Sequence, residues 1–321
     1  MARFGNDWGL TSKLSPFHPA TFPFNGSMHL DTVTIIGPGL LGGSLGLAIR
    51  QRQLPVRVHA YVRRPESAAE CLRLGAADFA SSDIKAAVEQ ADLVILCSPI
   101  SRMKELTLHL RSHLKPGAVV TDVGSVKTVV VQELEPLLRE VKATFVGSHP
   151  MAGSEKTGLS AARGDLFNNA ICLVTPTAQT PAAAFAFVRD FWKSLGAVPI
   201  RMSPEVHDDL VGRSSHLPHV IAAELANYVL SPAHPKEQAM VCATGFRDTT
   251  RIAASSPEMW RDISLANRKN LSRVLGVFIE DLQEFQLALE REDIEAVEEF
   301  FTKARQRREQ WHAHAAGMSP E

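Results

Sequence analysis

At its most informative point the chain reads Val33-Thr34-Ile35-Ile36-Gly37-Pro38-Gly39-Leu40-Leu41-Gly42. Four β-branched residues run directly into a G-x-G-x-x-G turn, and a helical pattern follows as far as Arg50. A strand, a glycine turn and a helix in this order predict a dinucleotide-binding loop, with the residues from Gly37 to Gly42 against the cofactor. Gly37 permits the tight turn, Gly39 lets the backbone approach a pyrophosphate, and Gly42 allows close helix packing. The alternative is a glycine-rich turn that binds nothing.

Outward from this loop, short β-branched runs alternate with amphipathic segments of helical length, from residue 31 to about residue 177. This alternation predicts an α/β fold, a Rossmann-like and mostly parallel sheet with crossover helices. The predicted strands are Thr32–Ile36, Val56–Val62, Leu93–Cys97, Val119–Asp122, Thr144–Gly147 and Ile171–Thr175. A turn-rich break with Pro176 and Pro181 follows, so we expect the dinucleotide-binding domain to occupy residues 31–178.

The remainder of the chain, residues 179–321, is predicted to be an all-helical substrate and dimerisation domain. Stretches such as Asp208–Leu230, Pro257–Glu290 and Asp293–His314 carry apolar residues at three- and four-residue spacing. The predicted helix from Pro257 to Glu290 is more apolar than a small domain needs, so we expect it to pair with a second copy in a homodimer. Residues 1–30 show no such spacing and are predicted to form a loose tail; alternatively, translation begins at Met28.

The composition excludes partners that are recognised by overall charge. Lys plus Arg number 34 and Asp plus Glu number 35, so no net field attracts nucleic acid or an anionic membrane, and we expect a small-molecule substrate. The four cysteines form no CxxC pair, which suits a reducing cytoplasm and indicates no metal site. Neither a signal peptide nor an apolar run of membrane-spanning length is found, so we expect a cytoplasmic protein.

The end of the second predicted strand bears on the choice between NADP and NAD. An enzyme that binds NAD usually has a carboxylate there for the ribose 2′-hydroxyl, but this chain has Val62. Without that charge a 2′-phosphate is not repelled, and Arg63 or Arg64 can bind it through paired hydrogen bonds. The sequence therefore favours NADP. The alternative is that both arginines are merely solvated and that NAD is used.

Three further segments follow predicted strands and would meet at the carboxyl edge of a parallel sheet. They are Cys97-Ser98-Pro99, expected beside the cofactor, then Gly124-Ser125-Val126-Lys127, and Gly147-Ser148-His149-Pro150. A neutral imidazole such as that of His149 suits the acceptor of an alcohol proton at neutral pH, and Ser125 can fix its tautomer and orientation. From spacing alone, a structural hydrogen bond of His149 is an equal alternative.

Two more histidines open a helix in the second half of the chain. The sequence Ser215-His216-Leu217-Pro218-His219 puts both imidazoles three residues apart on one helical face. A zinc pair would need further ligands, and no cysteine or third histidine is near. We therefore expect His216 and His219 to line a pocket; helix-start packing is the alternative.

A cluster of charged residues follows, with Arg247, Asp248 and Arg251 in one short stretch and Trp260 soon after. A guanidinium is the side-chain group best matched to a carboxylate, because it donates two parallel hydrogen bonds. The stretch therefore predicts a site for an anionic group of a substrate. Alternatively, Arg247 pairs internally with Asp248, which would leave Arg251 for an anion.

Together these blocks resemble the prephenate/arogenate dehydrogenase family. The resemblance is carried by the glycine loop from Gly37, D-x-G-S-x-K ending at Lys127, H-P-M-A-G-S-E from His149, S-H-L-P-H ending at His219, and G-F-R-D-T-T-R-I-A from Gly245 with M-W-R-D from Met259. The blocks occur in this order between about Val33 and Asp262. The helical remainder fits the family's dimerising domain in length and character.

The resemblance implies an oxidative decarboxylation of prephenate or arogenate in tyrosine biosynthesis, with hydride transfer to NADP or NAD. His149 matches the histidine that accepts the hydroxyl proton, Ser125 a serine that bonds to it and to the nicotinamide region, and Arg251 the arginine that holds a substrate carboxylate. The other substrate contacts implied or expected are His216, His219, Arg247 and Ser154, an acidic pair of Glu155 and Asp248 at the pocket mouth, and Trp260 as an apolar wall.

Two rival functions stand beside this one. A β-hydroxyacid dehydrogenase or imine reductase also joins a glycine-loop domain to a helical domain, but usually places a catalytic lysine or other donor in the helical half. A regulatory protein that senses NADP(H) without turnover would leave His149, Ser125 and Arg251 idle. No residue that we can name distinguishes prephenate from arogenate.

Overall fold

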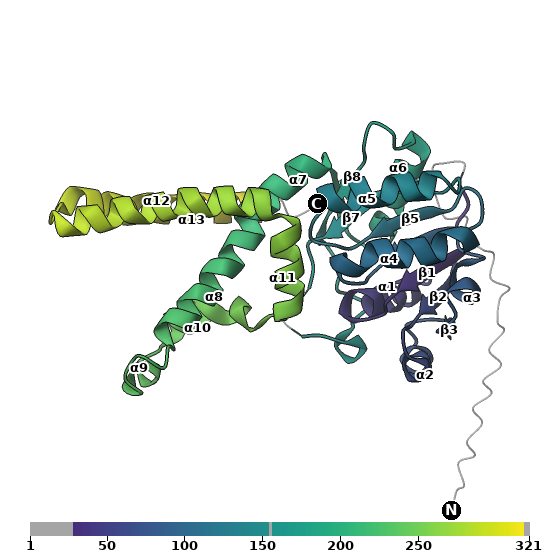
Figure 1. The fold of residues 1–321 in the computed structure, drawn as a ribbon, viewed down its shortest axis with the longest axis horizontal. Helices are drawn as coiled ribbons and strands as arrows, with labels where there is room; N and C mark the ends of the chain where they lie inside the picture. Colours follow the sequence, from purple (N-terminus) through teal and green to yellow (C-terminus); the bar gives the residue numbers. More distant parts are fainter. Residues whose placement is uncertain (1–27, 154–155, 318–321) are drawn as a thin grey trace, which may run out of the picture.

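The first part of the chain forms a six-stranded parallel sheet (Figure 1). The structure is a computed structural model that describes residues 28–153 and 156–317. The strands lie in the order β3-β2-β1-β4-β5-β6 and are β1 (Thr32–Ile36), β2 (Arg57–Tyr61), β3 (Phe79–Ser81), β4 (Leu93–Leu96), β5 (Val119–Asp122) and β6 (Thr144–Phe145). The strand order reverses between β1 and β4, where such sheets bind ligands. The Rossmann-like fold predicted from the sequence is confirmed.

Helices cover both faces of this sheet. They are α1 (Leu40–Gln51), α2 (Pro65–Arg73), α3 (Ile84–Val88), α4 (Ile100–Leu110), α5 (Thr128–Arg139) and α6 (Ala182–Ser194). Residues of α1, α2 and α6 pack with Ile35 in one apolar core, and residues of α3, α4 and α5 pack with Ile36 in another. Every residue of β1, β4 and β5 is buried, which is why these strands are almost continuous apolar runs in the sequence.

A second, three-stranded sheet follows. It consists of β7 (Gly147–Pro150), β8 (Ile171–Thr175) and β9 (Val198–Arg201), with β7 antiparallel and β9 parallel to β8. The sequence predicts one strand from Thr144 to Gly147, but β6 ends at Phe145 and the chain changes sheet at Val146. His149 therefore lies inside β7, and its expected position in a loop after a parallel strand is wrong.

The sequence predicts neither β3 nor β9. β3 has three residues without full burial or alternation, so its pattern is too short to identify. β9 contains Pro199, which lacks the N–H that a strand normally donates. Because β9 pairs with β8, the part beyond residue 178 is not helical throughout. We propose that the domain boundary lies near Met202.

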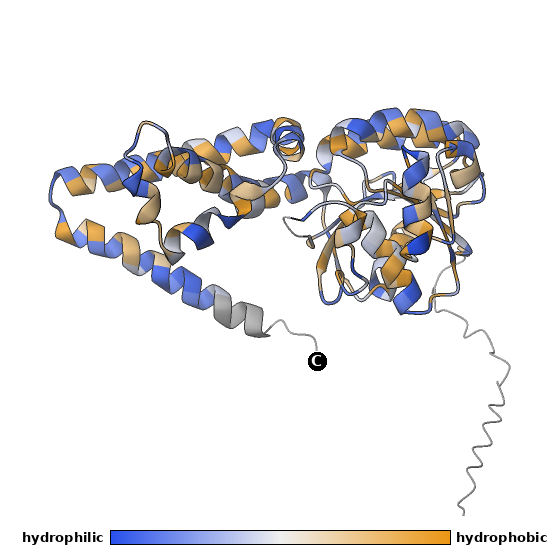
Figure 2. Ribbon diagram, turned by 90° about the horizontal axis from the view of Figure 1, so that it is seen from below, coloured by the Kyte–Doolittle hydropathy of each residue, from blue (hydrophilic) through white to orange (hydrophobic). Residues whose placement is uncertain are grey.

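Beyond β9 the chain is helical (Figure 1). The helices are α7 (Pro204–Val211), α8 (Leu217–Val229), α9 (Glu237–Met240), α10 (Thr244–Thr250), α11 (Pro257–Ala266), α12 (Arg268–Glu290) and α13 (Ile294–Gly317), and a π-turn (Gly212–His216) links α7 to α8. α12 and α13 lie side by side and extend away from the sheets, while α8, α9 and α10 form a second arm. Apolar residues recur along both arms (Figure 2), as their sequence spacing predicts.

The single helix predicted from Pro257 to Glu290 is in fact two helices, α11 and α12, which meet at Asn267 and point in different directions (Figure 1). Asn267 is 3% exposed, and its side-chain amide donates to the carbonyl of Asp208 at 2.8 Å. A short polar side chain that bonds to a distant backbone group competes with continuation of the helix. The helix is interrupted at Asn267, and the hydrogen bond of this residue ties the junction of α11 and α12 to α7.

The sequence also predicts a loose N-terminal tail, cysteines without disulfide bonds, and no membrane-spanning segment. The loose tail predicted for residues 1–30 falls almost wholly on residues 1–27, which lie outside the described residues. All four cysteines have unpaired thiols. Of the helices that the structure describes, none is long and apolar enough to cross a membrane.

Candidate active site

The glycine loop between β1 and α1 has the geometry that a bound pyrophosphate needs. Gly37 has a φ of +87°, which glycine adopts without strain, and its N–H donates to the carbonyl of Tyr61 at 3.1 Å. A Cβ on Gly39 would have no atom within 4 Å, so this residue faces open space. A Cβ on Gly42 would lie 2.8 Å from the Gly37 carbonyl oxygen, because α1 packs closely on the loop.

The first turn of α1 presents backbone donors to that space. The first helical bond runs from the N–H of Gly43 to the carbonyl of Gly39 at 2.8 Å, so the N–H groups of Leu40, Leu41 and Gly42 precede the helical ladder. No acidic side chain lies in this first turn. The donors and the positive end of the helix dipole together fit the pyrophosphate of a dinucleotide.

The segment after β4 lies against the same loop. The carbonyl oxygen of Cys97 is 3.4 Å from the position of a Cβ on Gly37. The hydroxyl of Ser98 is buried and has no hydrogen-bond partner in the described part of the chain, and Pro99 then precedes α4. A buried hydroxyl in this position fits a bound polar group. Burial raises the pKa of the Cys97 thiol, so this group stays protonated.

Two positive charges stand at the end of β2, the strand next to β1. Val62 is buried, whereas Arg63 and Arg64 are exposed. Within residues 28–153 and 156–317, neither guanidinium is in an ion pair. No carboxylate occupies the place of Val62 in this strand end. The two arginines are therefore available to an anionic group at this edge of the sheet.

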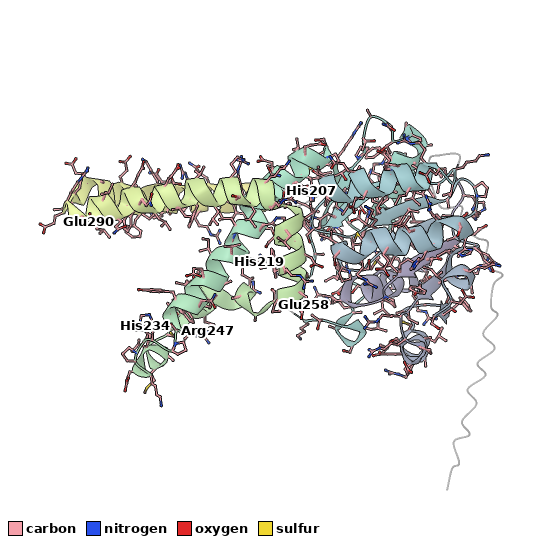
Figure 3. All side chains as sticks on the ribbon, in the orientation of Figure 1. His207, His219, His234, Arg247, Glu258 and Glu290 are labelled. Atoms are coloured by element: carbon pink, nitrogen blue, oxygen red, sulfur yellow. The ribbon has the colours of Figure 1, made fainter. Side chains whose placement is uncertain are left out.

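A chain of three side chains leads from His149 into the protein. Nδ1 of His149 lies 2.9 Å from Nε2 of His207, and Nδ1 of His207 lies 2.8 Å from Oδ1 of Asp208. His149 is 8% exposed, whereas His207 is fully buried. His149 belongs to β7, and the other two residues belong to α7. Figure 3 shows His207 where α7 meets the sheets, so this chain joins the two parts of the molecule.

Asp208 is anchored at the N-terminus of α5. Its carboxylate accepts from the backbone N–H of Lys127 at 2.7 Å and from that of Thr128 at 2.9 Å. Burial by itself would raise the pKa of Asp208, but the hydrogen bonds from His207 and these N–H groups lower it below its usual range. Asp208 is therefore ionised at neutral pH and can only accept hydrogen bonds.

A buried ion pair holds the strand of His149 in place. Lys127 and Asp122 are both fully buried, and Nζ of Lys127 contacts Oδ2 of Asp122. The ammonium also donates to the carbonyl of Ser148 at 2.8 Å, and Asp122 accepts from the N–H of Ser148 at 3.1 Å. β7 is thus bound to β5 one residue before His149. The first and last residues of the D-x-G-S-x-K block have this structural role.

His149 is uncharged at neutral pH. Burial lowers its pKa well below the ordinary value of 6.5, and the neighbouring His207, Lys127 and His216 lower it further. A neutral imidazole has one nitrogen with a lone pair, which can accept a proton. His149 therefore has the protonation state that a general base needs.

His216 ends the π-turn between α7 and α8. Its Nδ1 lies 3.1 Å from the side-chain amide nitrogen of Asn267, so Nδ1 accepts and Nε2 carries the proton of the neutral ring. Nε2 is buried and has no hydrogen-bond partner among the described residues. Burial lowers the pKa of His216 to about 4, although the carboxylate of Asp208 and the backbone of Ser125 raise it. A buried donor of this kind marks a place for a ligand acceptor.

His219 and Trp260 line a cavity of about 580 Å³ between α8, α11 and the turn Arg251–Ala254. The two rings stack with centroids 3.7 Å apart at an interplanar angle of 25°. Nδ1 of His219 donates to the carbonyl of Ser215 at 2.9 Å, and Nε1 of Trp260 has no partner in the described chain. Burial lowers the pKa of His219, and the nearby Arg251 lowers it further. His219 thus lies near the guanidinium of Arg251.

Ser125 does not have the contact expected of it. Among the described residues, no hydrogen bond joins Ser125 to His149; Nδ1 of His149 is hydrogen-bonded to Nε2 of His207 instead. His207 and Asp208 are not recognisable as site residues from the sequence, because they lie in a stretch that resembles any amphipathic helix. The adjacent His-Asp pair is the sequence signal that could have identified them; the burial of both side chains appears only in the structure.

The remaining predicted contacts lie away from this centre or cannot be placed. Arg247 and Asp248 are exposed on α10 and do not form the internal ion pair considered above. Figure 3 shows Arg247 well apart from His207. Ser154 and Glu155 lie outside the described residues. No group of three or more potential metal ligands occurs among the described residues.

Two family models match the chain. The nucleotide-binding domain of prephenate dehydrogenase matches residues 45–201, and the dimerization domain of prephenate dehydrogenase matches residues 203–303. The glycine loop itself precedes the first match. The matched ranges together contain most of the candidate site.

Individual proteins agree with the family models. A cyclohexadienyl dehydrogenase of Zymomonas mobilis is 37% identical over 281 residues, which is 86% of this chain and 94% of that protein. A prephenate dehydrogenase of Bacillus subtilis is 34% identical over 296 residues, which is 90% of this chain and 78% of that protein. The crystal structure of Aquifex aeolicus prephenate dehydrogenase with hydroxyphenyl propionate and NAD+ has a TM-score of 0.83 at 33% identity and covers 88% of this chain and 99% of that one.

Proposed function

The chain belongs to the prephenate dehydrogenase family and is an NAD(P)-dependent dehydrogenase, and from this premise we propose how its residues perform the reaction. The reaction is the oxidative decarboxylation of prephenate to 4-hydroxyphenylpyruvate, or of arogenate to tyrosine, in tyrosine biosynthesis. The observation that carries the proposal is the neutral, nearly buried imidazole of His149 on β7, which contacts β5 of the nucleotide-binding sheet. Family membership sets aside the β-hydroxyacid dehydrogenase and imine reductase alternatives.

In the proposed mechanism His149 is the catalytic base. It accepts the proton of the ring hydroxyl while hydride leaves the same ring carbon. The bound dinucleotide supplies the hydride acceptor. The carboxylate on the opposite ring carbon departs as carbon dioxide, and the ring becomes aromatic. Because aromatisation drives that second change, correct placement of the substrate and one base are sufficient.

The helical part is proposed to hold the substrate. Arg251 would bind a carboxylate through paired hydrogen bonds, beside His219. The buried N–H groups of His216 and Trp260, which have no acceptor in the described chain, would donate to further oxygens of the ligand. Ser125 is proposed to contact the cofactor and substrate rather than to orient His149. The other predicted contacts, Arg247, Asp248, Ser154 and Glu155, stay predictions.

We propose that NADP is the preferred cofactor. Val62 stands where a carboxylate would repel a 2′-phosphate, and Arg63 and Arg64 are exposed at the same strand end. NAD is the alternative, because the Aquifex aeolicus relative binds NAD+. Comparison of kcat/KM for the two cofactors decides between them, and a clear preference for NAD contradicts this proposal.

We also propose that the protein acts as a homodimer in the cytoplasm. The family model that matches the helical part is described as a dimerization domain. Large apolar side chains are exposed along α12 and α13, among them Val277, Leu282, Ile294 and Phe301. Apolar surface of this extent is typical of an interface between subunits. Unpaired cysteines suit a reducing compartment. Light scattering at micromolar concentration is expected to give a dimeric mass.

One spectrophotometric experiment tests the function. Purified protein is mixed with NADP+ or NAD+ and with prephenate or arogenate, and formation of the reduced nicotinamide is followed by its absorbance. We expect reduction with at least one substrate, accompanied by release of carbon dioxide. If the protein binds NADP(H) but reduces neither NADP+ nor NAD+ with either substrate, the proposal is wrong and the cofactor-sensing alternative is favoured.

A further inference from the structure

The buried histidine of α7 has no part in the mechanism described so far. We propose that His207 is a positioning residue that fixes the tautomer of His149 and takes its Nδ1 proton when His149 accepts a proton from the substrate. This inference rests on the proposed role of His149 as the base. It adds a proton relay from His149 to His207, where the nearby carboxylate of Asp208 stabilises the positive charge.

The direction of the two hydrogen bonds follows from the chemistry of their last member. Asp208 is ionised and accepts, so Nδ1 of His207 must donate across the 2.8 Å contact. A neutral imidazole has one N–H, so Nε2 of His207 has the lone pair and must accept across the 2.9 Å contact with His149. His149 therefore carries its proton on Nδ1. Its Nε2 has the lone pair that a base needs.

The surroundings determine where an added proton is most stable. The groups that face the two histidines are Asp122, Lys127, Cys172, Asp208 and His216. Burial lowers the pKa of both rings, and the positively charged or basic neighbours of His149 lower its pKa well below 6.5. For His207, burial is opposed by the direct hydrogen bond to Asp208. Positive charge is therefore more stable on His207, next to the carboxylate.

Every proton that the relay takes up is released again within one turnover. The hydroxyl proton of the substrate binds to Nε2 of His149 while the Nδ1 proton of His149 moves to Nε2 of His207. His207 keeps its own Nδ1 proton in the bond to Asp208 and becomes the imidazolium. After product leaves, the reverse shift returns the proton to Nδ1 of His149, and Nε2 loses its proton to water. These steps move protons only; the two electrons of the reaction leave the substrate with the hydride.

If His207 served only to fill space, burying its polar ring would cost desolvation free energy without a functional gain. An imidazole that loses its contact with water must form hydrogen bonds on both nitrogens to offset the cost of desolvation. An aromatic ring such as phenylalanine would fill the same space without that cost. The two short contacts in series, which end at a carboxylate held by the α5 N-terminus, fit a relay better than packing.

The first test measures the tautomer in the full-length protein without substrate. Histidine is labelled with ¹⁵N, and the His149 signals are identified by their absence in His149→Asn. At about pH 8, we expect a protonated Nδ1 and an unprotonated Nε2 for both His149 and His207. The opposite tautomer of His149 would overturn the proposal. This readout is independent of turnover, so it stands even if neither prephenate nor arogenate is a substrate.

The second test separates orientation from relay with two variants. In His207→Gln the side-chain oxygen can still accept from His149 and the amide can still donate to Asp208, but no proton can pass. We expect the same His149 tautomer, kcat lower by about tenfold, little change in KM, and an acid limb of the kcat profile moved to lower pH, because charge must now stay on His149. His207→Phe cannot accept at all, so we expect a mixed tautomer and a roughly 10²–10⁴-fold loss of kcat.

Controls make both tests decisive. His109→Gln, an exposed substitution on α4, should leave the spectrum of His149 and the kinetics unchanged. Thermal unfolding of each variant excludes loss of the fold as the cause of lower kcat. If His207→Gln lowers kcat without moving the acid limb, the relay is refuted. If His207→Phe keeps wild-type turnover and pH dependence while the wild type is active, the positioning role is refuted as well.

Discussion

Replacing Lys127 by methionine tests the buried ion pair that holds the strand of His149. The variant keeps most of the side-chain volume but removes the charge. Asp122 is then a fully buried carboxylate that retains the N–H of Gly124 at 2.9 Å and the N–H of Ser148 at 3.1 Å. The carbonyl of Ser148 also loses the ammonium donor. An unpaired buried charge is one of the most unfavourable changes that a single substitution can make.

The magnitude follows from this burial. Removing one partner of a buried ion pair costs about 3–5 kcal/mol, because the remaining charge has no compensation. A change of 1 kcal/mol shifts the thermal midpoint by about 2–4 °C in domains of about 150–250 residues, so the midpoint of Lys127→Met is expected to fall by roughly 6–20 °C. Adding Asp122→Asn removes the remaining charge, and the double variant should recover at least about half of that loss.

Thermal unfolding of the wild type, the two single variants and the double variant, followed by circular dichroism, measures this coupling. Initial rates over a range of cofactor concentrations show whether a loosened β7 lowers kcat more than cofactor affinity, as the position next to His149 predicts. Strictly additive midpoints across the four proteins would refute the reasoning. A loss under about 1 kcal/mol in Lys127→Met would do so too.

Further predictions concern Arg251, the glycine loop and the buried histidines. Arg251→Ala should chiefly raise the KM of the substrate, since the lost bond acts before and during reaction; an unchanged KM would exclude this role. Gly42→Ala should weaken NADPH binding by roughly 5- to 150-fold in a fluorescence titration, because overpacking costs about 1–3 kcal/mol, whereas Gly276→Ala, with no atom near its Cβ, should not. The buried histidines keep a lowered pKa in the fold, so below about pH 6.5 the unfolded chain binds more protons and stability falls, by up to about 1.4 kcal/mol per pH unit for each histidine. A urea midpoint that stays constant between neutral and mildly acidic pH would contradict their uncharged state.

The fold was predictable because its strongest signals are local. The strand, glycine turn and helix of the cofactor loop lie within about 20 residues of sequence, and buried parallel strands appear as apolar runs. The change of sheet at Val146 is not a local property. It depends on the ion pair of Lys127 with Asp122 and on pairing with β8, which the residues around Val146 do not reveal.

The candidate site was predictable only in part. His149 was identified by its neighbours in sequence and by the chemistry of imidazole. Its orientation was assigned to Ser125, because the residue that forms the bond, His207, lies 58 positions further along the chain. Asn267 was missed for a similar reason: its bonds to Asp208 and His216 interrupt a stretch whose apolar spacing predicts one continuous helix.

The most direct test of His149 as the base is the turnover of His149→Asn on the preferred substrate and cofactor. Asparagine can still occupy the position on β7 but cannot accept a proton at neutral pH. We expect kcat to fall by about 10²–10⁴-fold, with a modest change in KM and an unchanged cofactor affinity. Turnover close to that of the wild type would contradict the central claim that this imidazole is the base.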